Sequence, residues 1–233
     1  MLTLILAESA LETVPKELWK HPAVEHHSKR RHKSPRFIIL DRSYHHAAMK
    51  TIRDNEKRGR PDIVHFCLLE ALGSPLNKGG LLKIYVHTIN DQVISVSSEI
   101  RLPKNYIRFI GLMEQLFQFG KVPKTGNPLL ILEHKSLFEL ISALKPSYLV
   151  AFSKTGNPST LEEVVSRLKG EENPAVSIGG FPLGHFKEST RSLADEVVCV
   201  DPDMLEAWTV TSRFIYEFER ALSIPKKRLI RVS

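Results

Sequence analysis

The segment Ala175-Val-Ser-Ile-Gly-Gly-Phe-Pro-Leu-Gly184 is a short apolar run that continues into three glycines and a proline. Two further segments, Ala151-Phe-Ser-Lys-Thr-Gly156 and Val200-Asp-Pro-Asp203, likewise place tight-turn residues behind an apolar run of strand length. Ligands of open α/β proteins bind beyond the carboxyl ends of the strands. The three segments therefore predict a ligand site at one edge of a sheet, with three ordinary tight turns as the simpler alternative.

The composition of these segments indicates which ligand would fit. The glycines of 178–184 allow the backbone to approach a ligand closely, and Phe152, Phe181 and Leu183 could form an apolar wall for a planar base. Neither an acidic magnesium cluster nor a phosphate-binding Gly-Lys pair followed by Ser or Thr accompanies them. A nucleoside without phosphates is therefore a better candidate than ATP.

The rest of the chain alternates between strand-length apolar runs and segments of helical period, a pattern typical of an α/β fold. We expect a mostly parallel sheet with helices on both faces. A turn at 89–92 further predicts a hairpin over 82–97. The expected strands are 2–6, 37–40, 82–87, 93–96, 129–132, 147–152, 175–178 and 197–200, and the helices are 61–72, 105–119 and 204–222.

The last predicted helix carries an unusually bulky apolar stripe. Large side chains recur at three- and four-residue spacing along one side, and the stripe is either part of the core or a surface for self-association. Its members are Met204, Trp208, Ile215, Phe218 and Leu222.

Composition excludes several classes of protein. The 233 residues are 42% hydrophobic and 25% charged, which argues against a disordered chain. No apolar run approaches the roughly 20 residues of a membrane helix, so we expect no membrane contact. The two cysteines, Cys67 and Cys199, lie among apolar neighbours and indicate a reducing, cytoplasmic environment.

The charge is concentrated near the start of the chain. Of a formal net charge of +7, residues 15–36 contribute +5 and residues 50–60 contribute +3. Such a basic excess favours a nucleic-acid partner over a merely solvated loop. The histidines among 21–46 stand between these bases, whose charge opposes a cation, so we expect no metal site there.

A third basic group lies at the start of the predicted helix 105–119. Lys104 and Arg108 are four residues apart and share one helix face, while Arg101 precedes them. Three cations beside a helix N-terminus can hold a phosphate. The alternative is a solvated basic face.

Four motifs in this order resemble one known family. They are Arg60-Pro-Asp62-Ile-Val-His65-Phe-Cys-Leu-Leu69, Ser74-Pro-Leu-Asn-Lys78-Gly-Gly-Leu-Leu82, Val86-His-Thr88 and Arg101-Leu-Pro-Lys104-Asn-Tyr-Ile-Arg108-Phe-Ile-Gly-Leu-Met113. The chain resembles the ribosome-biogenesis methyltransferases of the SPOUT (α/β-knot) class that methylate N1 of a pseudouridine in small-subunit rRNA. The resemblance runs from about Leu2 to the end and is most specific through Met113.

The resemblance implies a single SPOUT domain over 1–233, with a basic insertion at 15–36, a hairpin-like extension at 82–97 and a deep C-terminal trefoil knot. It also implies a homodimer, S-adenosyl-L-methionine as cofactor, an rRNA loop as substrate, and contacts with other ribosome assembly factors. It assigns rRNA contacts to Arg60, Arg101, Lys104 and Arg108, with Asp62 orienting Arg60. The cofactor-binding residues it implies are Phe152, Thr155, Gly156, Gly179, Gly184, Val200, Asp201, Pro202, Asp203, Met204 and Leu205.

Two functions are compatible with these features. An enzyme would mainly align a methyl donor with a flipped-out base, and the sequence offers no clear general base. A non-catalytic RNA-binding assembly factor could use the same basic surface. Measurable affinity for S-adenosylmethionine would favour the enzyme, and its absence would favour the assembly factor.

Overall fold

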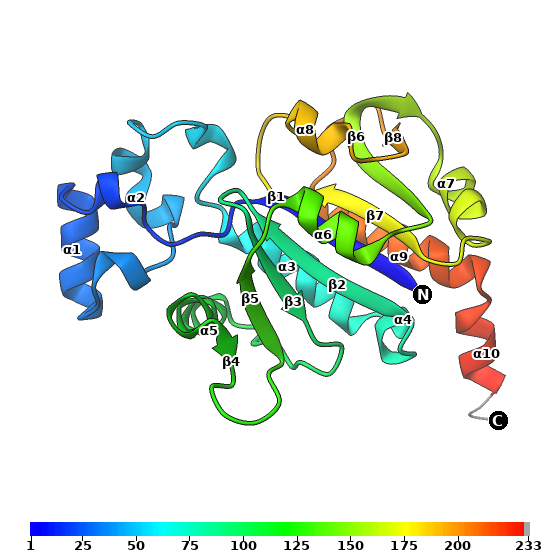
Figure 1. Cartoon of the computed structure of the whole chain (residues 1–233), viewed down its shortest axis with the longest axis horizontal. Helices are drawn as coiled ribbons and strands as arrows, with labels where there is room; N and C mark the ends of the chain where they lie inside the picture. The colour runs from blue at the N-terminus through cyan, green and yellow to red at the C-terminus, as the bar shows by residue number, and fades with distance from the viewer. Residues whose placement is uncertain (231–233) are drawn as a thin grey trace.

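A computed structural model describes residues 1–230 and places an eight-stranded sheet at the centre of the protein (Figure 1). The sheet order is β4-β5-β3-β2-β1-β7-β6-β8, in which β2, β1, β7, β6 and β8 run parallel and β3, β5 and β4 join antiparallel. The expected mostly parallel sheet is confirmed. The strands are β1 Leu2–Ser9, β2 Leu82–Thr88, β3 Gln92–Val96, β4 Lys121–Val122, β5 Leu130–His134, β6 Tyr148–Pro158, β7 Pro174–Gly179 and β8 Glu196–Cys199.

Helices cover both faces of this sheet, as the alternation predicts. The packed core of one face includes α3, α5, α7 and α9, and that of the other includes α6 and the segment 181–197. The α-helices are α1 Pro22–Arg31, α2 Arg42–Met49, α3 Pro61–Gly73, α4 Pro75–Lys78, α5 Tyr106–Phe119, α6 Leu137–Leu144, α7 Leu161–Leu168, α8 Glu188–Arg191, α9 Ala207–Ala221 and α10 Ile224–Ile230. None of the helices over 1–230 is long and apolar enough to cross a membrane. The trefoil knot stays a prediction.

The two cores meet through the central strand β1. Leu4 and Leu6 belong to the core beneath α3 and α9, whereas Ile5 and Ala7 belong to the core beneath α6. Successive side chains of a strand point to opposite faces, so an uninterrupted apolar run is required here. This explains why 2–6 is readable from sequence as a buried strand.

The expected hairpin forms between β2 and β3, in the register Ile84 opposite Val96. It does not project from the sheet, because β2 also pairs with β1 along its length. Residues 82–97 therefore link the parallel part of the sheet to its antiparallel part.

The basic stretch 15–36 folds into α1 and two short 3₁₀ helices, Lys16–Leu18 and Pro35–Phe37. With α2 it encloses a small apolar cluster of its own, formed by Val14, Leu18, Val24, Ile38, Leu40, Ala48, Met49 and Ile52. The prediction of a strand at 37–40 is wrong, because only Ile39 makes an isolated bridge, to Thr13. Ile38 and Leu40 pack in this cluster, Ile39 packs in the main core, and backbone hydrogen bonds join the run to residues 12–14 outside the sheet.

Two further boundaries differ from the sequence-based expectation. The last long helix begins at Ala207, because residues 201–206 form a loop instead of a helical turn. Strand β6 continues to Pro158 through an irregularity in which Phe152 and Asn157 both pair with Val198. The segment 153–156 is thus a bulge within a strand, with no separate loop.

The apolar stripe of α9 is mainly core. Ile215 and Phe218 are buried, and Trp208 and Leu222 are half-buried against the same core. Met204 lies before the helix and is 54% exposed. Of the two alternatives for the stripe, core and self-association surface, the packing supports the core.

Candidate functional site

A cavity of about 130 Å³ lies beside the irregularity of β6 and the carboxyl ends of β7 and β8, where the three glycine- and turn-rich segments were expected to meet. Its lining comes from residues 152–154 at the irregularity of β6, from the end of β7 and the segment after it, and from the end of β8 and the segment that leads to α9. The residues are Phe152, Ser153, Lys154, Ile178, Gly179, Phe181, Pro182, Leu183, Gly184, His185, Phe186, Val198, Cys199, Val200, Asp201, Asp203, Met204, Leu205, Glu206, Ala207 and Val210.

Glycines keep the segment after β7 close to its neighbours. A Cβ on Gly180 would lie 2.2 Å from Ser9 Oγ at the end of β1. A Cβ on Gly179 would lie 2.8 Å from the Phe181 ring, and Gly184 has a φ of +93°. A larger residue at Gly179 or Gly180 would collide with the Phe181 ring or with Ser9, and one at Gly184 would be strained by the positive φ.

The segment after β8 is held by its own polar groups. The backbone N–H of Asp203 donates to Asp201 Oδ1 at 2.9 Å, and the Cys199 thiol donates to the Asp201 carbonyl at 3.1 Å. The Asp201 carboxylate therefore acts as a turn-forming group. The turn presents Val200, Met204 and Leu205 to the cavity.

Three of the residues assigned to the cofactor lie outside the cavity lining. Thr155 accepts a hydrogen bond from Arg191 Nη1 at 2.5 Å. Gly156 packs against β8, where an added Cβ would meet Val197 O and two Val198 backbone atoms at 2.6 Å. Pro202 is exposed within the turn.

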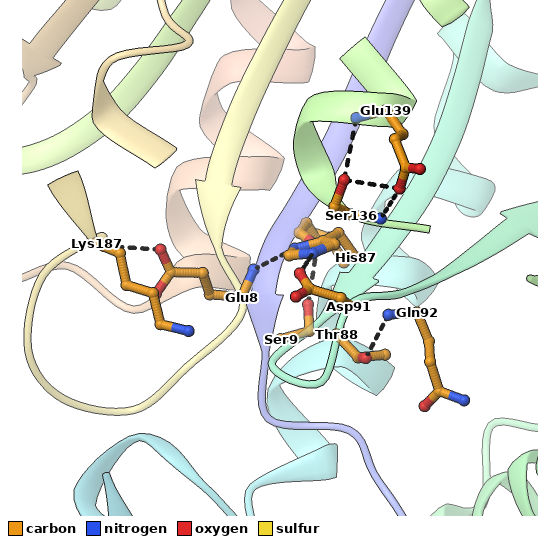
Figure 2. A network of polar contacts seen from close by, with 10 residues as sticks. Glu8, Ser9, His87, Thr88, Asp91, Gln92, Ser136, Glu139 and Lys187 are labelled. Carbon is orange, nitrogen blue, oxygen red and sulfur yellow. Dashed lines mark hydrogen bonds and ion pairs between the residues drawn. The ribbon is translucent and has the colours of Figure 1, made fainter. Parts of the chain in front are cut away.

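Glu8, at the end of β1, anchors the segment after β7 (Figure 2). It is buried with a φ of +49°, and its Oε1 accepts from the Lys187 backbone N–H at 2.7 Å. Its own N–H donates to His87 Nδ1 at 3.3 Å. Non-glycine residues with such a φ cost about 1–3 kcal/mol and need support from their surroundings.

Lys57 provides a second anchor from the basic segment 50–60. Its ammonium donates to Glu8 Oε2 at 3.0 Å and to the His185 carbonyl. The same group lies 4.5 Å from the centroid of the Phe181 ring. The segment between Phe181 and Lys187 is thus fixed by contacts that come from β1 and from residue 57.

Arg60 and Asp62 form a fork-to-fork pair at the start of α3. Arg60 Nε donates to Asp62 Oδ1 at 2.8 Å, and Arg60 Nη2 donates to Oδ2 at 2.8 Å. Both side chains stay partly exposed, at 36% and 27%. The hydrogen bonds with Asp62 raise the pKa of Arg60, and the Glu206 charge adds to this effect. A fixed, partly exposed guanidinium suits recognition of phosphate.

Arg101, Lys104 and Arg108 are all exposed around the start of α5. The intervening backbone is held in place where His65 of α3 hydrogen-bonds the Pro103 carbonyl at 2.7 Å. Asn105 caps the helix by accepting from the Arg108 N–H at 3.1 Å. The structure therefore places the three cations together, on a segment packed against the helix that begins beside Arg60.

A family model described as "EMG1/NEP1 methyltransferase" matches residues 4–219. The chain belongs to this family. The resemblance inferred from the four motifs is confirmed, and the EMG1/NEP1 motifs can be assigned to α3, α4, β2 and α5.

Named relatives within the EMG1/NEP1 family align over nearly the whole chain. "Ribosomal RNA small subunit methyltransferase Nep1" of Thermococcus onnurineus is 46% identical over 219 residues, covering 94% of this chain and 98% of its own. The protein of the same name from Thermococcus kodakarensis is 47% identical over 227 residues, covering 96% and 100%. The crystal structure of Archaeoglobus fulgidus Nep1 bound to S-adenosylhomocysteine matches with a TM-score of 0.84 and 37% identity, covering 95% and 98%.

Sequence reasoning missed several residues that line the cavity or anchor its segments. Glu8 and Lys57 lie far from the cavity segments in sequence, and no local spacing relates them to the segment after β7. Ser153, Lys154 and Glu206 lie within or beside the quoted segments but carried no motif. Their only available signal was the rule that strand ends of a parallel sheet gather at one edge, which applies to Glu8 as well.

Proposed function

We propose that this protein transfers a methyl group from S-adenosyl-L-methionine to N1 of a pseudouridine in a loop of small-subunit rRNA. The observation that carries the proposal is the three-segment cavity, which is lined in part by the first turn of α9, the helix that packs against α3, at whose start the Arg60–Asp62 pair lies. A cofactor site and a candidate RNA-binding group are thus neighbours. The name and bound ligand of the Archaeoglobus fulgidus relative support the same cofactor chemistry.

The cavity has the chemistry of a nucleoside site. Phe152 and Ile178 offer apolar walls, and the glycine backbone leaves room at the strand ends. Its volume of about 130 Å³ is below the roughly 300–1,000 Å³ of typical ligand pockets. We therefore expect Leu183 and Met204, which are 55% and 54% exposed, to shift when the cofactor binds.

When bound, S-adenosylmethionine supplies a methyl group that its positively charged sulfur has already activated. The chain's own residues then have to position the acceptor base. We assign this task to Arg60, which holds the flipped-out nucleotide while Asp62 keeps the guanidinium in one orientation. Arg101, Lys104 and Arg108 hold the phosphates of the loop.

The substrate claim predicts a difference between two RNAs. With S-adenosylmethionine labelled in its methyl group, a hairpin RNA with pseudouridine in its loop should accept the label, whereas the same hairpin with uridine should not. The reason is that uridine has a glycosidic bond at N1 and no proton there to replace. Mass analysis of the digested nucleosides measures the outcome, and equal transfer to both RNAs would refute the pseudouridine specificity.

The alternative function, a non-catalytic RNA-binding assembly factor, is tested by calorimetry. An enzyme must bind S-adenosylmethionine without RNA or together with it. RNA binding with no measurable cofactor affinity in either condition would favour the assembly factor. Contacts with other assembly factors and a cytoplasmic location remain predictions of the sequence.

We further propose that the protein is a homodimer. The α9 stripe is mostly used by the core, so support comes from Leu183 and Met204, two large exposed apolar side chains at the cavity. A second copy would cover such a surface. Sedimentation equilibrium should give about twice the chain mass of 26.5 kDa, and Met204→Glu should shift the distribution toward the single chain. A wild type that sediments as one chain would refute this.

A further inference from the structure

Lys57 joins two parts of the site that are far apart in sequence. Its ammonium donates to Glu8 Oε2 at 3.0 Å and to the His185 carbonyl, and its side chain is only 12% exposed. A Cβ on Gly184 would lie 3.1 Å from Lys57 Cε, so the lysine stem also packs closely against this backbone. Lys57 therefore holds the segment 181–187, most of which lines the three-segment cavity.

The carboxyl end of segment 181–187 is fixed to β1 through the same carboxylate. Glu8 Oε1 accepts a hydrogen bond from the Lys187 backbone N–H at 2.7 Å (Figure 2). Glu8 is buried, so its charge is balanced by Lys57 in a part of the protein that excludes water. Separating such a pair is costly, because it leaves a buried charge uncompensated. We therefore expect segment 181–187 and residue 57 to move together.

The segment 57–60, which leads from this lysine to the start of α3, is held along its length. Arg58 Nε and Nη2 donate to the two carboxylate oxygens of Glu12 at 2.7 and 2.6 Å. The Gly59 carbonyl accepts from the Arg42 N–H at 2.9 Å. The arginine that ends the segment forms the ion pair at the start of α3. A displacement of residue 57 is therefore passed on to this arginine, since each intervening residue is fixed to its neighbours.

Cofactor binding is expected to act on this connection. The three-segment cavity, at about 130 Å³, has to widen for a nucleoside, and Leu183 lies in the segment that Lys57 holds. Residues 183–185 are exposed, so their position depends strongly on the contacts with Lys57. A cofactor packed against this segment favours one position of it, and Lys57 carries that preference to segment 57–60.

RNA binding acts on the same connection from the other end. RNA held by Arg60 favours one position of segment 57–60, and Lys57 carries this preference back to segment 181–187. Methyl transfer requires both ligands at once, so the joined segments have a position that suits both. Once one ligand has fixed that position, the other does not have to fix it again.

From these observations we infer that Lys57 couples the cofactor cavity to the RNA-binding group, so that a bound cofactor strengthens RNA binding. By thermodynamic linkage, RNA strengthens cofactor binding by the same factor. The inference rests on the proposed function, because it takes S-adenosylmethionine and a looped RNA as the two ligands. Lys57 is a positioning residue, since its ammonium is engaged by Glu8 and by the His185 carbonyl.

The test compares RNA affinity with and without a bound cofactor product. S-adenosylhomocysteine serves as the probe because its sulfur carries no methyl group to transfer. The anisotropy of a fluorescent hairpin RNA with one loop pseudouridine gives the dissociation constant in each condition. Wild type should bind this RNA about tenfold more tightly with S-adenosylhomocysteine, within the range of about 5–150-fold typical of coupled sites. Calorimetry of S-adenosylhomocysteine with and without RNA should give the same factor.

Two variants remove the connection in different ways. Lys57→Met keeps the length of the stem but loses the ammonium, and should lower the coupling factor to about one, the value for independent sites. Glu8→Gln keeps an oxygen for the Lys187 N–H but gives Lys57 no opposite charge, and should also lower the factor. Urea unfolding reports whether each variant folds, and Glu8→Gln decides the test where Lys57→Met does not fold.

Lys33→Met is the matched control. Lys33 also donates to a buried carboxylate, Glu114 Oε2 at 2.7 Å, but its partner lies on α5 instead of beside the cavity. A lost attraction for phosphates would weaken RNA binding equally in both conditions, so the coupling factor should stay at its wild-type value. An equal loss of coupling in Lys33→Met and Lys57→Met would be a general response to breaking an ion pair and would overturn the inference.

The remaining outcomes separate this inference from the proposed function. A wild-type coupling factor of about one, RNA binding weakened by S-adenosylhomocysteine, or a wild-type factor in the deciding variant would overturn the inference. Methyl transfer from S-adenosylmethionine to the same hairpin is recorded separately. Transfer without coupling overturns the inference alone, whereas coupling without transfer overturns the proposed function alone.

Discussion

Gly156→Ala is expected to remove measurable S-adenosylmethionine binding and to destabilise the fold. The added Cβ would lie 2.6 Å from three backbone atoms of Val197 and Val198. Backbone atoms of a paired strand cannot turn aside as a flexible side chain can, so β6 and β8 must separate. The cavity depends on this pairing, because its lining includes Phe152 of β6 and the segment that leaves β8.

The expected size follows from overpacking in a close-packed interior. Such substitutions typically cost 1–3 kcal/mol, and a clash with backbone on a paired strand belongs at about 3 kcal/mol. Urea unfolding measures the loss of stability, and calorimetry measures the cofactor affinity, for which we expect a reduction of at least about a hundredfold. The affinity falls because the displaced segment after β8 carries Val200, Met204 and Leu205.

Gly170→Ala is the matched control. A Cβ at Gly170, which follows α7, would meet nothing within 4 Å. The substitution should leave cofactor affinity unchanged and should stabilise the protein slightly, if at all, by restricting the unfolded chain. Wild-type stability and cofactor affinity in Gly156→Ala would mean that the β6 bulge does not shape the cavity.

Arg60→Ala is expected to reduce methyl transfer about a hundredfold while leaving S-adenosylmethionine affinity unchanged. The arginine does not line the cofactor cavity, and misplacement of a reacting group by about 1 Å can cost a factor of this size. RNA affinity should fall, and the slope of the logarithm of affinity against the logarithm of salt concentration should decrease in size by nearly one, because one phosphate contact is lost. Single-turnover methylation and salt-series binding measure the two effects.

Two further variants refine this expectation, one in the Arg60–Asp62 pair and one in the basic group at the start of α5. Asp62→Asn keeps the charge of Arg60 but removes the carboxylate that accepts from both Nε and Nη2. It should lower methyl transfer with a smaller loss of RNA affinity, because orientation is lost and the cation is kept. Arg108→Ala should act on affinity and salt dependence alone, as expected of a phosphate contact.

Arg167→Ala is the control for removing a paired arginine. Arg167 on α7 binds both oxygens of Glu196 at 3.1 Å and is 38% exposed, similar to Arg60 at 36%. It should retain RNA affinity and methyl transfer. Equal losses in Arg60→Ala and Arg167→Ala would show that the effect is a general response to losing an ion pair, and unchanged transfer in Arg60→Ala would exclude it from positioning.

Local pattern explains which parts of the fold are readable from the sequence. The run 2–6 reads as a buried strand because both of its faces are covered, and 61–72 reads as a helix because Pro61 and Asp62 suit a helix start. The run 37–40 has the same apolar character as a strand. It folds otherwise because Ile38 and Leu40 are buried in the cluster with α1 and α2 and Ile39 is buried in the main core, a circumstance that the run itself does not encode.

The candidate site, too, could be predicted from the sequence only in part. Glycine and turn residues marked the three segments of the cavity, because close backbone approach restricts the residue type at each position. The resemblance assigned Gly156 to the cofactor, and the structure places it against β8. A glycine at this position indicated a close neighbour, and the tertiary structure identifies that neighbour as the backbone of β8.

The sequence by itself determined the alternation of strands and helices, the family, and the concentration of positive charge near the start of the chain, because each of these depends on residue type and local spacing. Tertiary structure alone decided that Glu8 and Lys57 anchor the segment after β7, and that His27, Tyr44 and Glu114 meet at one cavity. The physical reason is distance along the chain. These groups are brought together by packing between elements, and no short-range periodicity records which side chains such packing will place in contact.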